Sequence, residues 1–415
     1  MLFIYRALIN LIIIFSPIII FFRLIKKKEH PVRFKEKLCF ISKKRGPGKL
    51  IWFHGSSVGE ILSVIPIIEK LEKDKSIKKI LLTTSTLSSS NILKKFKFKK
   101  TIHQFFPIDS NHFSKKFINH WMPNTVFFIE SEIWPNFLLN IKRKNIPLIL
   151  LNARITKKSF RKWKKISKFS RTIFECFDVA FAQNNETKKY LIKLGIKNIR
   201  LLGNLKFSKT KIKIKNKLNR NLVSFFKSKK IWCASSTHDN EEIISAAAHK
   251  NLKVKFKNLL TVIIPRHINR VDEIVNKIED LDLKVHLHSS KNKIKEDTEI
   301  YIVDTYGETE NFFSICKTVF LGGSLINRGG QNPLEAARLG CRIIHGPNVN
   351  NFNEIYKLLG KNQISKKVNN INKLILELRI ILKKNVSSEK IINKLKKLGD
   401  TILNSTLLEI KKFIN

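Results

Sequence analysis

The sequence predicts an α/β protein with two doubly wound, Rossmann-like domains that face a cleft. Short apolar runs that fit buried strands alternate with helical segments along most of the chain. A Lys- and Asn-rich stretch at 208–230 fits a linker and divides this alternation into two similar halves. The 415 residues give each half enough length for its own core. We therefore divide the chain into residues 1–25, 26–212 and 213–415.

The first of these segments is predicted to be a membrane-anchor helix. Residues 2–22 are almost entirely apolar, and Arg23 and Lys26–Lys28 follow at once. About 20 apolar residues are enough to cross a bilayer, and positive charge behind them predicts a cytoplasmic location for the rest of the chain. Pro17 leaves a helix that lies in the membrane surface as the alternative. The basic segment 29–48 fits either a stretch along acidic headgroups or a linker.

The N-terminal domain has five predicted strands, each followed by a helix. They cover residues 50–53, 80–84, 126–129, 147–151 and 179–182. In a parallel sheet, ligands bind beyond the carboxyl ends of the strands. Polar residues follow three of these strands, namely Glu60, Glu130 and Asn152–Arg154. We therefore expect a polar site at this edge of the sheet.

The C-terminal domain has five more predicted strands and a helical tail at 366–415. The strands cover residues 230–234, 259–264, 299–303, 318–321 and 341–345. The fourth of them runs into two glycine pairs, Gly322–Gly323 and Gly329–Gly330, and then into a helix that Pro333 opens and Gly340 closes. Such a loop fits either a phosphate site or an ordinary strand-to-helix connection.

The composition indicates an anionic partner. Lys and Arg number 80 against 32 Asp and Glu, a formal net charge of +48. The many Lys, Ile, Asn and Phe residues have AT-rich codons, so part of this charge reflects the genome. The charge is dispersed and no nucleic-acid recognition motif accompanies it, so we predict no nucleic-acid partner. The five cysteines lack a C-x-x-C pair, which fits a reducing compartment and argues against structural zinc.

A series of short motifs then points to one family. In order they are His54–Glu60, Glu130–Asn136, Asn152–Arg154, Gly203–Phe207, Ser236–His238, Pro265–His267, Asp304–Glu308, Gly322–Ser324, Arg328–Glu335 and Asn351–Glu354. Together they resemble the bacterial 3-deoxy-D-manno-octulosonic acid (Kdo) transferases of lipopolysaccharide assembly, from the anchor to about residue 360. The resemblance implies the GT-B fold, with an N-terminal acceptor domain and a C-terminal donor domain. It also implies transfer of Kdo from CMP-Kdo to lipid IVA, the lipid A precursor, at the cytoplasmic face of the inner membrane.

The resemblance also implies roles for individual residues. Glu60 would be the base that takes the proton from the acceptor hydroxyl, and Glu130 and Lys206 would support the transition state. The implied CMP contacts are Pro265, Arg266, Tyr306, Gly307, Glu308, Asn332, Pro333, Leu334 and Glu335. A sugar hydroxyl is a poor nucleophile, so a positioned carboxylate suits the chemistry. Taken alone, however, Glu60 also fits a helix-start glutamate favoured by the helix dipole.

No metal or cofactor besides the donor substrate is expected, because the histidines lack metal-ligand spacing. The sequence departs from the family pattern at three donor-side positions, where Tyr306 replaces Met, Gln331 replaces His and Asn348 replaces the His of a Gly-Pro-His stretch. The alternative enzyme is another membrane-associated GT-B transferase that moves a sugar from a UDP-sugar to a lipid. An inactive homologue is a further alternative, and the intact motifs argue against it.

Overall fold

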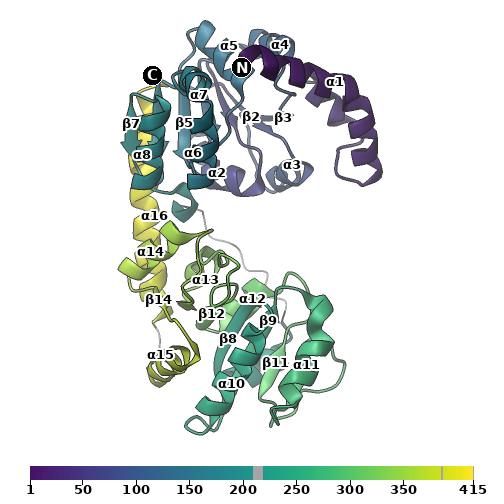
Figure 1. Ribbon diagram of the computed structural model, residues 1–415, viewed down its shortest axis with the longest axis vertical. Coiled ribbons are helices and arrows are strands. Elements are labelled where there is room, and N and C mark those ends of the chain that lie inside the picture. Colours follow the sequence, from purple (N-terminus) through teal and green to yellow (C-terminus); the bar gives the residue numbers. More distant parts are fainter. Residues whose placement is uncertain (209–217, 385–386, 415) are drawn as a thin grey trace. The chain divides into compact units, whose positions relative to one another are not determined.

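The computed structural model describes residues 1–208, 218–384 and 387–414 (Figure 1). The chain forms two compact units, which we call unit 1 (Met1–Thr210 and Leu398–Asn415) and unit 2 (Lys211–Lys397). The predicted boundary between residues 212 and 213 lies outside the described residues.

Unit 1 contains a parallel sheet of seven strands in the order β3-β2-β1-β4-β5-β6-β7. The strands are β1 (Leu50–His54), β2 (Lys79–Thr84), β3 (Thr101–Phe105), β4 (Thr125–Ile129), β5 (Leu148–Ala153), β6 (Val179–Ala182) and β7 (Ile199–Leu201). The helices are α1 (Leu2–Ile25), α2 (Val58–Leu71), α3 (Leu87–Leu93), α4 (Asn111–Trp121), α5 (Pro135–Arg143), α6 (Lys157–Lys165), α7 (Ser167–Phe174) and α8 (Asn185–Leu194), with 3-10 turns η1 (Arg33–Leu38) and η2 (Leu205–Ser208). The five predicted strands are confirmed, and the edge strands β3 and β7 were not predicted.

Unit 2 repeats this design, with a parallel sheet in the order β10-β11-β9-β8-β12-β13-β14. Its strands are β8 (Lys230–Thr237), β9 (Leu259–Pro265), β10 (Val285–Leu287), β11 (Ile300–Ile302), β12 (Thr318–Leu321), β13 (Arg342–His345) and β14 (Ser365–Lys367). Its helices are α9 (Arg220–Ser228), α10 (Glu241–Lys253), α11 (Val271–Glu279), α12 (Thr309–Ile315), α13 (Leu334–Arg338), α14 (Asn353–Lys361) and α15 (Ile371–Lys383), with the turn η3 (Ile268–Arg270). Here too the central strands are confirmed and the short outer strands were not predicted.

The stretch read as a linker at 208–230 contains helix α9, which corrects that part of the prediction. The Asn219 side chain caps the first turn by accepting a hydrogen bond from the Asn221 amide (3.0 Å). Phe225 and Phe226 are buried on one side of the helix, and the Phe226 ring meets Tyr301 of β11 edge-on. Two adjacent aromatic residues in a lysine-rich segment therefore belong to the core of unit 2.

The last helix, α16 (Ser388–Lys411), corrects the assignment of all of 213–415 to one domain. Its residues from Leu398 onward group with unit 1. Ile410 is fully buried, and the close approach of the helix to Phe207 leaves no room for a side chain at Gly399. Beyond the helix, the carbonyl of Phe413 accepts a hydrogen bond from Thr125 Oγ1 (2.6 Å). The end of the chain thus completes the first unit.

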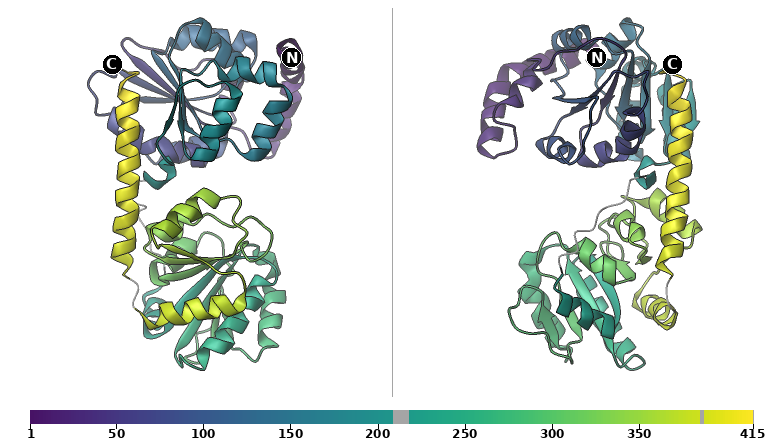
Figure 2. Two further views of the ribbon diagram at one scale, coloured as in Figure 1. Left: turned by 60° about the vertical axis from the view of Figure 1, so that its left-hand side comes forward. Right: turned by 180° about the vertical axis from the view of Figure 1, so that it is seen from behind.

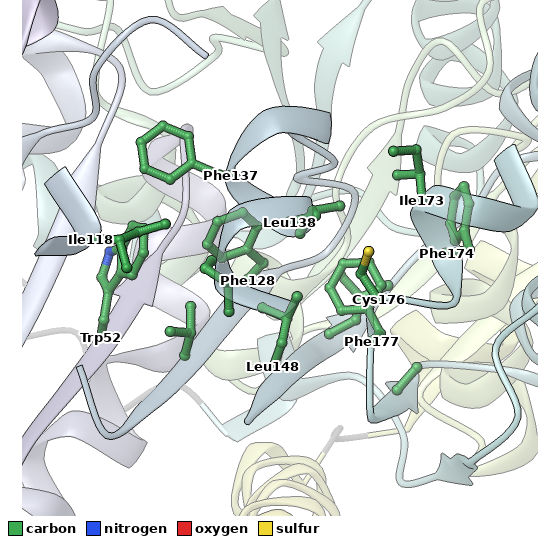
Figure 3. Close-up of a cluster of buried hydrophobic side chains, with 14 of the residues drawn as sticks. Trp52, Ile118, Phe128, Phe137, Leu138, Leu148, Ile173, Phe174, Cys176 and Phe177 are labelled. Atoms are coloured by element: carbon green, nitrogen blue, oxygen red, sulfur yellow. The ribbon is translucent and has the colours of Figure 1, made fainter. Parts of the chain in front are cut away.

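The core of unit 1 lies between the sheet and the helices on one of its faces (Figure 3). Trp52 of β1 is fully buried, and its ring contacts Phe128 of β4 and Phe137 of α5 with centroids 5.5 and 5.8 Å apart. Its indole N–H donates to Thr83 Oγ1 of β2 (2.9 Å), so the one polar atom of the side chain has a partner. Strand β1, which leads into the site described below, is thereby held on both sides.

The basic segment 29–48 is docked onto unit 1 and is not a free linker. Its turn η1 carries Glu36, whose side chain is 2% exposed. The Glu36 carboxylate accepts hydrogen bonds from the Phe105 amide at the end of β3 (2.7 Å) and from Arg33 (2.8 Å). A buried carboxylate with these partners ties the segment to the edge of the sheet.

Candidate active site

Helix α2 begins at the carboxyl end of β1 with a capping box. Ser57 Oγ accepts a hydrogen bond from the Glu60 amide (3.3 Å), and Glu60 Oε2 accepts from the amides of Ser56 (2.7 Å) and Ser57 (3.3 Å). Glu60 therefore has the helix-start role that its position allows. This role fixes the carboxylate at the edge of the sheet. The carboxylate stays accessible to solvent, because the residue remains partly exposed.

Glu60 lies in an acidic environment. Burial raises its pKa to about 7, and the negative charges of Glu132 and Glu130 add to the shift. These two glutamates follow β4, which pairs with β1 in the sheet. Strand pairing thus brings together carboxylates some 70 residues apart in sequence. A carboxyl group whose pKa is near neutral can hold or release a proton at physiological pH, as a general base requires.

Glu130 and Lys206 form an ion pair. Lys206 Nζ is 2.5 Å from Glu130 Oε1, and the Glu130 side chain is 7% exposed. Glu130 has a positive φ of 56°, a strained conformation for a residue with a side chain. The turn that carries Lys206 is anchored through the Leu205 amide, which donates to Asn152 Oδ1 (3.0 Å). Asn152, at the end of β5, therefore positions Lys206 beside Glu130.

Glu132 is hydrogen-bonded to residues beside Glu60 and was not among the predicted site residues. Its Oε2 accepts hydrogen bonds from Ser56 Oγ (2.6 Å) and Trp134 Nε1 (2.7 Å) and lies 3.0 Å from His54 Nε2. Burial opposes ionisation of this carboxyl, but the hydrogen bonds from His54, Ser56 and Trp134 outweigh it and hold the pKa of Glu132 below its usual value. The sequence motifs contain each of these residues, but not their connection.

The residues predicted to contact CMP lie at one edge of the second sheet. Pro265 ends β9 and Arg266 follows it, exposed. Residues 306–308 follow β11, and residues 332–335 follow β12. Strands β11, β9, β8 and β12 are consecutive and parallel, so their carboxyl ends lie along the same edge. The structure thus collects the predicted donor residues in unit 2 and the predicted catalytic residues in unit 1.

The individual donor-side residues differ in exposure. Tyr306 is 70% exposed, and at Gly307, whose φ is positive, an added Cβ would meet no other atom. Glu308 precedes α12 and accepts a hydrogen bond from Asn311 Nδ2 (2.5 Å). At the start of α13, Asn332 Oδ1 accepts from the Leu334 amide (3.2 Å) and Pro333 is the residue before the helix. Leu334 is buried, whereas Glu335 is exposed.

The glycine loop after β12 is held by Glu241, a residue that sequence reasoning missed. The fully buried Glu241 carboxylate accepts hydrogen bonds from the amides of Gly323 (2.6 Å), Ser324 (3.1 Å) and Leu325 (3.0 Å). Gly322 passes so close to Ser236 that an added Cβ would lie 2.6 Å from its carbonyl oxygen. The Gly322 amide donates to the Ser235 carbonyl (2.9 Å) and the Gly323 amide to the Glu241 carboxylate, so the first glycine pair shapes the loop and does not present its N–H groups to a phosphate.

Two of the three positions that depart from the family pattern make polar contacts with neighbouring residues of unit 2. Gln331 Nε2 lies 3.4 Å from His238 Nε2. The Asn348 amide donates to the Ser324 carbonyl (2.9 Å), and its side chain donates to the Leu325 carbonyl (3.2 Å). The third is the exposed Tyr306.

Within residues 1–208, 218–384 and 387–414, no group of three or more His, Cys, Asp or Glu side chains is arranged to hold a metal ion.

Comparison with known proteins identifies the family. Residues 32–209 match the family model described as 3-deoxy-D-manno-octulosonic-acid transferase (kdotransferase). A 3-deoxy-D-manno-octulosonic acid transferase from Rickettsia bellii is 34% identical over 372 residues, which cover 90% of this chain and 88% of that protein. The Haemophilus influenzae transferase of the same name is 28% identical over 84% of each chain.

Solved structures show the same fold at low sequence identity. A putative UDP-N-acetylglucosamine 2-epimerase from Listeria monocytogenes matches with a TM-score of 0.61 and 15% identity, covering 88% of this chain and 96% of that one. The UDP-GlcNAc 2-epimerase from Neisseria meningitidis matches with a TM-score of 0.59 and 15% identity, over 87% of this chain and all of the other. Two doubly wound parallel sheets in one chain and this likeness confirm the predicted GT-B fold. With the sequence identity to the Rickettsia bellii transferase, they establish that this chain belongs to the 3-deoxy-D-manno-octulosonic acid (Kdo) transferase family of glycosyltransferases.

Proposed function

We propose that the chain transfers Kdo from CMP-Kdo to the lipid A precursor lipid IVA at the cytoplasmic face of the inner membrane. The observation that carries this proposal is the grouping of Glu60, Glu130 and Lys206 at one edge of the first sheet. Membership of the family supplies the reaction class. The apolar helix α1, which among the described residues is the one long and apolar enough to cross a membrane, supports a lipid acceptor.

In the proposed mechanism, ionised Glu60 takes the proton from the acceptor hydroxyl as its oxygen bonds to the anomeric carbon of Kdo. The bond between that carbon and the phosphate oxygen of CMP breaks in the same step, with inversion relative to the donor, and CMP leaves with the electron pair. Lys206, oriented by Glu130, supplies positive charge where negative charge develops.

The donor would bind at the carboxyl edge of the second sheet. Arg266 is exposed there and can pair with the phosphate of CMP, and Glu335 can accept hydrogen bonds from the ribose hydroxyls. Asn332 fixes the start of helix α13, which carries Glu335, by accepting a hydrogen bond from the Leu334 amide. These cationic and polar side chains can serve a monophosphate leaving group, so the mechanism has no step that requires a metal or a cofactor.

The direct test is detergent-solubilised protein with lipid IVA and CMP-Kdo generated in situ, with product masses read by mass spectrometry. We expect a mass gain in Kdo units. The absence of a gain, under conditions in which an authentic Kdo transferase works, would overturn the proposal. A panel of UDP-sugars on the same acceptor tests the alternative enzyme, and transfer from one of them would establish it.

The pKa of Glu60 predicts a pH dependence. Because the ionised carboxylate is the active form, kcat is expected to rise with pH through about 7. Replacing Glu132 with glutamine removes a negative charge that raises this pKa, so the acid limb should move down by roughly 0.5–1 pH unit. Rates measured between mild acid and mild alkali with Glu132→Gln and the control Glu69→Gln, farther along α2, check this. An unmoved limb in Glu132→Gln would contradict the assignment of that limb to Glu60.

A further inference from the structure

Helix α1 exposes large apolar side chains along its whole length. Their exposed fractions run from 45% at Ile12 to 83% at Phe3, and only 11% of its most apolar 18-residue window is buried. One side of the helix packs against the rest of unit 1. That side carries Tyr5, Ile9, Ile13, Ser16 and Ile20, which are all buried or partly buried and recur at helical spacing. Figure 2 shows the helix along the outside of this unit.

The N-terminal end of α1 is bound into the folded body of unit 1. The Tyr5 hydroxyl donates to Asp109 Oδ2 (2.7 Å), and Arg6 Nε donates to Asn136 Oδ1 (2.9 Å). Asp109 is 1% exposed and also accepts from the amides of Asn136 (3.0 Å) and Phe137 (2.9 Å) at the start of α5. Tyr5 therefore completes a buried hydrogen-bond network that holds another helix in place.

The C-terminal end of α1 is bound to the same unit. Arg23 Nε pairs with Glu29 Oε1 (2.6 Å), and Lys37 Nζ pairs with the same oxygen (2.7 Å). Glu29 is 4% exposed. The backbone carbonyl of Lys37 in turn accepts from the Ile108 amide (2.9 Å), one residue before Asp109. Both ends of the helix are thus clamped to unit 1.

The two clamps restrict how the helix can meet a membrane. Its 24 residues give a length of about 36 Å, enough to cross a hydrocarbon core of about 30 Å. A spanning helix would place Tyr5 and Arg23 in opposite headgroup layers. Both residues are bound to one folded unit, which cannot stand on both sides of the bilayer. Length and composition permit spanning, but the clamps exclude it.

We propose that α1 lies along the surface of an anionic bilayer, its exposed apolar residues inserted into one leaflet and its two ends clamped to unit 1. The inference rests on the membrane association included in the proposed function and goes beyond it by fixing the orientation. Lysines 26–28 follow the C-terminal end of the helix. Near the other end, the Tyr5 ring contacts Phe169 of α7, with ring centroids 6.4 Å apart. Helix α7 directly follows α6 in the sequence.

Charge identifies the lipid. Helix α6 has the sequence KKSFRKWKK, and its Lys and Arg side chains are all exposed. Lys26–Lys28 at one end of α1, and helix α6, which leads into the helix that Tyr5 contacts at the other end, supply cationic groups that match the phosphate layer of an anionic leaflet. We expect at least about tenfold weaker binding to neutral phosphatidylcholine vesicles than to vesicles that contain phosphatidylglycerol. Equal binding to both would contradict the choice of an anionic leaflet.

Spin labels on the full-length protein test the orientation. Ile4, Leu11, Ile18 and Ile25 are spaced seven apart on the side opposite the packed residues, and each is at least 50% exposed. Each is replaced by cysteine in turn and labelled, and the five native cysteines are buried and so protected from the label. Depth in phosphatidylethanolamine–phosphatidylglycerol vesicles is read from the relative accessibility of each label to oxygen and to a water-soluble nickel complex.

We expect the same shallow depth at all four positions. Labels that are deepest at 11 and 18 and shallow at 4 and 25 would show a spanning helix and overturn the proposal. Four labels in water would overturn it too. Kdo transfer in detergent, measured on the same preparations, reports separately on the proposed function.

A released helix provides the second measurement. In the variant Tyr5→Phe with Arg6→Leu the N-terminal clamp is removed, and positions 11 and 18 are expected to move deeper than 4 and 25. Asn10→Leu, at an exposed position of the same helix, adds hydropathy without touching the clamp and should keep the shallow profile. An unchanged profile in the clamp variant would show that Tyr5 and Arg6 do not set the orientation, against the proposal.

Discussion

Replacing Glu60 with glutamine is expected to lower kcat for Kdo transfer by about 10²–10⁴-fold, the usual contribution of a general base. Glutamine keeps the size of the side chain and can replace glutamate in a capping box, so helix α2 should still form. The amide cannot accept the proton of the acceptor hydroxyl. The KM for CMP-Kdo should change little, because the predicted donor contacts belong to unit 2.

The matched control for this variant is Ser57→Ala. It removes the other half of the capping box, at a cost of about 0.5–2 kcal/mol of stability, and leaves the Glu60 carboxylate in place. We expect its kcat to stay within a few-fold of the native value. If Glu60→Gln retains native kcat, or if Ser57→Ala loses as much activity, then Glu60 acts at the helix start and not as the base.

Replacing Glu241 with alanine is expected to lower the free energy of unfolding of unit 2 by about 3–5 kcal/mol. Three loop amides and the His238 amide would lose their acceptor inside the protein, and an unsatisfied buried donor costs about 1–3 kcal/mol, part of which entering water would offset. The glycine loop should open locally even where the unit stays folded. Because the loop leads to Asn332 and Glu335, the KM for CMP-Kdo should rise as well.

Urea denaturation and hydrogen exchange check this prediction. Trp232 is the single tryptophan of unit 2, so a fluorinated tryptophan at this position reports unfolding of that unit by NMR. Amide exchange in the peptide that spans Gly322–Leu325 reports the loop. Glu279→Ala, at an exposed position of α11, is the control and should change the unfolding free energy by less than about 0.5 kcal/mol. Native protection of the loop amides in Glu241→Ala would refute the role assigned to this carboxylate.

The central strands could be predicted from the sequence because they are buried on both faces and read as continuous apolar runs. The outer strands could not. Strand β3 contains His103 and Gln104, β14 consists of Ser365 and two lysines, and β10 is three residues long. Such strands depend on pairing with a neighbour already in place and carry little hydrophobic signal of their own. The same reason applies to α9, where two phenylalanines stand in a lysine-rich segment.

The residues of the candidate site also fall into those that the sequence could predict and those that it could not. Glu60 and Glu130 could be predicted from the strand ends, because parallel strands bring their carboxyl ends together. Lys206 was indicated only by the resemblance to the family, and the structure brings all three residues into one cluster. Glu241 could not be predicted, because it binds amides 82 to 84 residues away and looks like an ordinary first-turn helix glutamate. The hydrogen bonds of Glu132 could not be predicted either, because they depend on the pairing of β1 with β4.

The shared helix α16 has a consequence for the order of folding during synthesis. Residues 211–397 form a continuous segment, so unit 2 can fold as soon as the ribosome has extruded it. Unit 1 begins earlier but ends later. Lys49 Nζ donates to the carbonyl of Ile414 (2.6 Å), a bond that joins residues made 365 positions apart. The first unit to be started is therefore the last to be finished, and the surface of unit 1 that residues 398–414 cover stays open to solvent until those residues have been made.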